Sequence, residues 1–123
     1  MSSTLLLITA PPTSRFAFHA LCLAQAMHKK QQPFEVFFYQ EAVTVAHAAL
    51  WRSDDELNLT AAWQDLGIEL PVCVSAAIMR GITDEDNATR HQLNHCNLAT
   101  GFKLVGLGTL AEAISQARHL IQF

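Results

Sequence analysis

Residues 70–81 of this chain read Leu70-Pro71-Val72-Cys73-Val74-Ser75-Ala76-Ala77-Ile78-Met79-Arg80-Gly81. The stretch starts as a short apolar run, which is typical of a buried strand, and continues in a helical pattern that Gly81 ends. Cys73 is therefore expected at the carboxyl end of a strand, where the next helix begins. Ligands and catalytic groups collect at this edge of open α/β sheets.

The position of Cys73 allows two interpretations. A helix N-terminus carries unpaired N–H groups and partial positive charge, which favour the thiolate, the nucleophilic form of cysteine. A free cysteine is also among the most buried residue types, so a packing role at the strand end is an equally good reading. Position alone does not decide between them.

Strand-like and helical segments alternate along the chain. We expect strands at 4–9, 34–39, 70–74, 102–105 and 119–123, and helices at 15–30, 41–50, from 54 or 55 to 66, 75–80, 84–93 and 109–118. This alternation predicts parallel βαβ units. The predicted fold class is α/β, a three-layer sandwich with a mostly parallel sheet of about five strands. The length of 123 residues suits a single domain, residues 1–123.

The composition favours some kinds of protein and argues against others. Only 15% of the residues are charged, whereas about 25% is usual, so we expect a partner to cover part of the surface. The net charge of −3 and the lack of a basic cluster give direct nucleic-acid binding no support. No apolar run approaches a membrane span, and no signal peptide is recognised. Three widely spaced cysteines imply no disulfide framework, which favours a cytoplasmic location.

Metal and nucleotide sites have weak support. His91, His95 and Cys96 form the only cluster that resembles metal ligands, and we favour solvent-facing histidines instead. Gly106-Leu107-Gly108 lacks the third glycine and the Lys-Ser/Thr pair of a phosphate loop. We therefore predict neither a metal nor a cofactor.

The other cysteines and the polar residues near the predicted sheet edge are weaker candidates. We expect Cys22, inside the first helix, to pack in the core, and Cys96 to be a buried spectator, with a resolving role for Cys73 as the alternative. Tyr39, Glu41 and Arg80 are expected near the same edge as Cys73, and ordinary surface or loop roles are the default for them.

Segments along nearly the whole chain resemble the DsrE-like sulfurtransferase family. They are Val36–Val43, Ala62-Trp63-Gln64, Val72–Ala77 with Arg80-Gly81, Asp84-Glu85, Asn97-Leu98, Gly101-Phe102, Leu104–Ala113 and Gln122-Phe123. Cys73 falls on the sulfur-carrying cysteine of that family. The chain departs from the family pattern in shorter loops at 10–14 and 66–70, and in His95-Cys96, where small serine-type residues are expected.

The resemblance implies a sulfurtransferase that accepts sulfane sulfur as a persulfide on Cys73 and passes it on, without a metal or nucleotide cofactor. It implies TusB-like and TusC-like homologous subunits, a TusE-like sulfur acceptor and an upstream persulfide carrier, as in the TusBCD relay. That relay ends in 2-thiouridine at the tRNA wobble position. Such a role requires an accessible, activated thiol, and no direct contact with nucleic acid or a membrane.

Three other functions stay open at this point. One is a DsrE-type subunit of dissimilatory sulfur oxidation, with DsrF and DsrH partners and the same chemistry. Another is a non-catalytic assembly subunit, whose cysteine is structural. The third is a small redox or ligand-binding α/β protein, which only Cys96 suggests.

Overall fold

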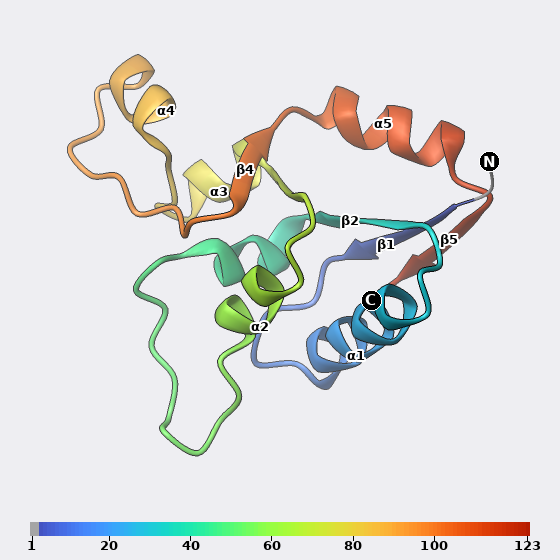
Figure 1. The fold of residues 1–123 in the computed structure, drawn as a ribbon. Helices are drawn as coiled ribbons and strands as arrows, with labels where there is room; N and C mark the ends of the chain where they lie inside the picture. The colour runs from blue at the N-terminus through green and yellow to red at the C-terminus, as the bar shows by residue number, and fades with distance from the viewer. Residues whose placement is uncertain (1–2) are drawn as a thin grey trace.

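Strands and helices alternate along residues 3–123, the part of the chain that the computed structural model describes (Figure 1). The strands are β1 (Thr4–Ile8), β2 (Phe34–Phe38), β3 (Leu70–Cys73), β4 (Phe102–Val105) and β5 (His119–Gln122). The helices are α1 (Arg15–Lys29), the 3-10 helix η1 (Gln40–Ala46), α2 (Leu59–Asp65), α3 (Val74–Met79), α4 (Glu85–Arg90) and α5 (Leu107–Gln116). Among residues 3–123, no helix combines the length and the apolar character needed to cross a membrane.

The strands form one sheet in the order β4-β3-β2-β1-β5, and every neighbouring pair is parallel. β1 lies between β2 and β5, and its Leu5 and Leu6 are fully buried. A strand buried on both faces reads as a continuous apolar run, which explains the sequence of β1. Helices α1 and α2 lie on one side of the sheet and α5 on the other (Figure 1). The predicted α/β class, with a five-stranded parallel sheet between helices, is confirmed.

Side-chain caps fix several helix starts. The Ser14 hydroxyl accepts the Phe16 N–H at 3.1 Å ahead of α1, and Asp84 Oδ1 accepts the Asn87 N–H at 2.8 Å ahead of α4. Each cap satisfies a backbone donor that the first helical turn leaves free. Both starts follow from the sequence, because the capping residue lies next to the helix that it begins.

The predicted start of α2 at Asp54 or Asp55 is wrong. These two residues lie in a turn, and the helix begins at Leu59. Asn58 provides the cap, with its Oδ1 accepting the Ala61 N–H at 3.0 Å. The predicted end is close to the observed one, since Gly67 has a φ of +67° just beyond the helix.

The predicted helix over 41–50 is also corrected. The segment is the shorter 3-10 helix η1, and the next residue, His47, forms an antiparallel bridge with Leu98. The Ala48 N–H donates to Asn97 O at 2.8 Å, and the Ala99 N–H donates to Ala46 O at 2.7 Å. These bonds between distant residues take up backbone groups that a longer helix would need.

The predicted packing role of Cys22 is wrong, because Cys22 is exposed on α1. The buried side of this helix consists of small and medium side chains: Ala17, Ala20, Leu21 and Ala24. A helix that packs closely on a sheet presents such small residues, and Cys22 lies outside this face.

Candidate functional site

Cys73 lies where the sequence predicts it. It is the last residue of β3 and the N-cap residue of α3, with extended backbone angles. In the sheet it is opposite Val105 at the end of β4, and the preceding Val72 is opposite Phe38 at the end of β2. The sulfur atom is therefore carried at the carboxyl edge of the sheet, between two neighbouring strand ends.

The Cys73 side chain is buried in the chain by itself, with an exposed fraction of 1%. β3, α3 and η1 pack against one another at this point. The chain enters η1 through Gln40, whose φ of +53° turns it over the sheet edge immediately after β2. The accessible thiol expected from the sequence is therefore not present in the isolated chain. A reagent must wait for a local opening of this corner before it reaches the sulfur.

Arg80 and Glu41 form an ion pair beside this corner. Arg80 Nη2 and Nε donate to Glu41 Oε1 at 2.6 and 3.1 Å, and Arg80 Nη1 donates to Ala76 O at 2.9 Å. The hydrogen bond from Arg80, followed by its charge, holds the pKa of Glu41 below its usual value of 4.5. The pKa of Arg80 is raised, mainly by the bond to Glu41, and charge on Glu41 and on Cys73 adds to the effect. The pair links the end of α3 to the start of η1. Tyr39, also expected at this edge, is half-buried just before Gln40.

The ion pair predicts a pH dependence. A carboxylate with a depressed pKa stabilises the fold above its unfolded-state pKa, and the contribution disappears as the pH falls through the folded-state value. We therefore expect the Glu41 carboxyl to titrate below 4.5 in the native chain, and closer to 4.5 in an Arg80→Met variant. Carboxyl-carbon NMR titration measures both midpoints. An unchanged midpoint in the variant would show that the pair does not form in solution. The effect on stability is expected to be small, because Glu41 is well exposed.

The remaining sequence candidates do not form a metal site. Within the described chain, no three His, Cys, Asp or Glu side chains are grouped so that they could hold a metal ion. His91 and Cys96 are exposed, and His95 Nε2 lies 3.1 Å from Gly81 O. The expected burial of Cys96 is therefore wrong. Cys22, Cys73 and Cys96 are all free thiols.

Asn97 is a structural residue for which the sequence predicts no role. Its Oδ1 accepts the N–H of the fully buried Thr83 at 2.9 Å, and its Nδ2 donates to Gly81 O at 2.7 Å. The same side chain lies 3.4 Å from His47 Nε2. Asn97 thus holds the segment that follows α3 and ties it to the segment that follows η1. Its only sequence signal was its place in a family-like segment.

An Asn97→Ala substitution is expected to destabilise the chain by about 1–3 kcal/mol, because it removes the acceptor of a buried N–H group. The free energy of unfolding in urea measures the loss. Asn94→Ala is the matched control, since exposed Asn94 makes only a 3.5 Å contact with His95. Equal stabilities of the two variants would show that Asn97 does not hold the two segments together.

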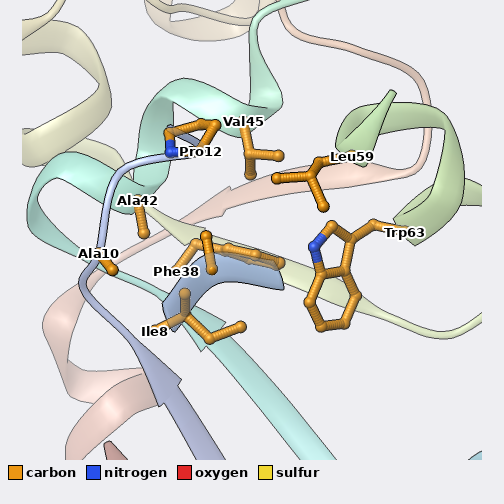
Figure 2. A pocket seen from close by; sticks show the side chains of 9 residues that line it. Ile8, Ala10, Pro12, Phe38, Ala42, Val45, Leu59 and Trp63 are labelled. Carbon is orange, nitrogen blue, oxygen red and sulfur yellow. The ribbon is translucent and has the colours of Figure 1, made fainter. Parts of the chain in front are cut away.

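The structure contains a small cavity and a larger cleft, and Cys73 lines neither of them. One is an apolar cavity of about 10 Å³, no more than a single water molecule needs, and Trp63, Phe38 and Val45 are among the side chains around it (Figure 2). The other is a polar cleft of about 240 Å³, which His47, Gln64 and Thr100 help to line. Two of its polar side chains already bond within the chain: Gln64 Nε2 donates to Thr100 O at 2.7 Å, and His47 Nδ1 accepts the Ala49 N–H at 2.9 Å.

The sequence as a whole matches the model of one protein family, the DsrE/DsrF-like family, over residues 2–123. The chain belongs to the DsrE/DsrF-like family. The resemblance noted in the sequence is confirmed.

Individual relatives agree with this assignment. Sulfurtransferase TusD of Serratia proteamaculans is 42% identical, covering 96% of each chain. Sulfurtransferase TusD of Pectobacterium atrosepticum is 41% identical, covering 100% of both chains over 129 aligned positions. This chain has 123 residues, so gaps fall within it, as loops shorter than the relative's would produce. The crystal structure of the ychN protein from E. coli has a TM-score of 0.78 and 18% identity, covering 100% of this chain and 99% of that one. At this identity it shows the shared fold alone.

Proposed function

We propose that this chain is a sulfur-relay subunit, a single DsrE-like sulfurtransferase domain over residues 1–123, that carries sulfane sulfur as a persulfide on Cys73. The observation that carries the proposal is the position of Cys73 at the junction of β3 and α3, in a chain whose relatives are named sulfurtransferases. Cys22 and Cys96 lie away from any strand end.

The proposed chemistry consists of two exchanges at sulfur. The Cys73 thiolate attacks the outer sulfur of a donor persulfide, so that a new S–S bond forms at Sγ while the donor S–S bond breaks and the donor thiolate leaves. A thiolate of a TusE-like acceptor then attacks the outer sulfur on Cys73, and the Cys73 thiolate leaves. Zero-valent sulfur moves between thiolates, so neither step needs an oxidant or a reductant. The rates depend on thiolate fraction, nucleophilicity and access.

The structure limits the access of donor and acceptor to the Cys73 sulfur. With Cys73 buried at the corner of β3, α3 and η1, donor and acceptor reach the sulfur only when this corner opens. Partner subunits of the TusB and TusC type are the proposed cause of opening, since a ligand that binds the open state better shifts the population toward it. The low charge content of the chain fits a subunit whose surface is partly covered by such partners.

The test is mass spectrometry of the intact chain and of its peptides after incubation with cysteine, a cysteine desulfurase and the upstream persulfide carrier. The TusB-like and TusC-like subunits are included, and a Cys73→Ser variant is the control. One added sulfur atom on the Cys73 peptide, absent from the variant, supports the proposal. A loaded carrier together with an unmodified Cys73 would reject it and favour the assembly-subunit function.

The biological end point that we propose is 2-thiouridine at the tRNA wobble position, in the cytoplasm, because the relatives carry the TusD name. A DsrE-type role in sulfur oxidation uses the same exchange. Deleting the gene separates the two: loss of 2-thiouridine from bulk tRNA supports the tRNA pathway, and unchanged 2-thiouridine rejects it.

A further inference from the structure

We propose that Arg80 is a positioning residue for the sulfur of Cys73. While the site is closed, Glu41 binds the guanidinium of Arg80 and keeps it from the sulfur. This inference rests on the proposed function. Its basis is the arrangement of Cys73, Arg80 and Glu41 around α3, a constellation that the exchange chemistry described above does not use.

Cys73 and Arg80 flank α3 as its N-cap and C-cap residues. Seven positions are close to two helical turns, so the two Cα atoms lie on about the same side of the helix as Ala76 and Ala77. Ala76 and Ala77, which lie between them, are buried and small. The Arg80 side chain reaches back one turn toward Cys73, since its Nη1 donates to Ala76 O at 2.9 Å.

Glu41 can be released from Arg80 at little cost in free energy. Arg80 Nε and Nη2 both bind a single oxygen of Glu41, and Glu41 is 60% exposed while the Arg80 side chain is 26% exposed. An exposed carboxylate is replaced at little cost, because water solvates it well once it is released. When η1 moves away from β3 and α3, Glu41 moves with it. The guanidinium is then free to face the anionic sulfur that appears on Cys73, as thiolate or as persulfide.

Charge on Cys73 also raises the pKa of Arg80, as the smallest of its causes, after the hydrogen bond and the charge of Glu41. Once it is released from Glu41, the guanidinium attracts anionic sulfur by Coulomb's law. Anionic donors and acceptors are attracted for the same reason. Arg80 thus acts on the sulfur through its charge, and the hydrogen bonds to Ala76 and Glu41 set where that charge lies.

The test compares two alkylating reagents of similar size on the full chain, anionic iodoacetate and neutral iodoacetamide. Peptide mass spectrometry gives the rate of each at Cys73, and their ratio reports local charge, because site opening and thiolate fraction cancel. The variants are Arg80→Met, Arg80→Lys and Glu41→Gln. Arg118→Met is the matched control: Arg118 precedes β5, and its N–H bonds to Ser3 O at the opposite edge of the sheet. The exposed Cys22 and Cys96 serve as internal references.

We expect the iodoacetate-to-iodoacetamide ratio at Cys73 to fall about threefold in Arg80→Met, to be largely kept in Arg80→Lys and to rise in Glu41→Gln. A ratio in Arg80→Met equal to that of wild type and Arg118→Met would overturn the positioning role. Sulfur loading of Cys73 in the wild type is then measured separately. Loading with an unchanged ratio rejects only the role of Arg80, whereas a changed ratio without loading rejects the relay function and leaves the charge effect in place.

Discussion

Replacing Cys73 with serine is expected to abolish sulfur transfer, lowering its rate by more than about a hundredfold. A serine oxygen does not carry sulfane sulfur as a persulfide, so the two exchanges lose their covalent intermediate. Only direct exchange between donor and acceptor remains, and the two thiols are then not held together. The measurement is the transfer of radiolabelled sulfur from cysteine, through a desulfurase and the upstream carrier, to a TusE-like acceptor in the presence of the TusB-like and TusC-like subunits.

The burial of Cys73 requires a second variant in this experiment. A serine hydroxyl buried there without a partner costs about 1–3 kcal/mol, so a loss of activity in Cys73→Ser could reflect lost folding. Cys73→Ala carries no polar atom into the core, and circular dichroism with urea unfolding checks both variants. Cys96→Ser and Cys22→Ser remove exposed thiols and should keep both stability and transfer. Transfer at the wild-type rate in folded Cys73→Ala would show that Cys73 is not the carrier.

The sequence allowed the sheet and the helix starts to be predicted wherever the decisive residues are neighbours. The apolar run of β1 indicates a buried strand, and Ser14 lies directly before the helix that it caps. The error at η1 occurs where distant residues decide, since the end of η1 depends on the bond from the Ala99 N–H to Ala46 O. The error at α2 is a choice between local caps, because Asn58 rather than the acidic residues starts this helix.

The same distinction explains the site. The place of Cys73 between strand and helix is a local property, and it was predicted correctly. Its burial depends on η1, which comes from a segment about thirty residues earlier in the chain. Glu41 and Arg80 are 39 residues apart, and no spacing in the sequence marks them as a pair. Local sequence patterns therefore predict the position of the thiol. The helix that buries it and the ion pair beside it are seen only in the folded chain.

Replacing Trp63 with alanine is expected to destabilise the chain by about 3–5 kcal/mol, a large share of the stability of a typical domain. Trp63 is 2% exposed, and its ring packs edge-on against Phe38 at a centroid distance of 5.2 Å. Phe38 in turn packs against Phe102 at 5.7 Å, so the indole completes an aromatic cluster that joins α2 to β2 and β4. Figure 2 shows Trp63 beside Leu59 at the small apolar cavity, which the substitution would enlarge. Urea unfolding followed by circular dichroism measures the loss.

Trp51 provides the matched control, because it is 82% exposed and Trp51→Ala should change stability by no more than about 0.5 kcal/mol. The substitution at Trp63 also bears on the thiol. Trp63 lies in α2, and α2 is tied to η1 by the Thr60 hydroxyl, which donates to Val45 O at 2.6 Å. Loosening α2 should therefore loosen η1 and speed the alkylation of Cys73, relative to the exposed Cys22, in chains that are still folded. If Trp63→Ala lowers stability but leaves that relative rate unchanged, η1 does not control access to Cys73, and the opening of the site must come from α3 or from the end of β4.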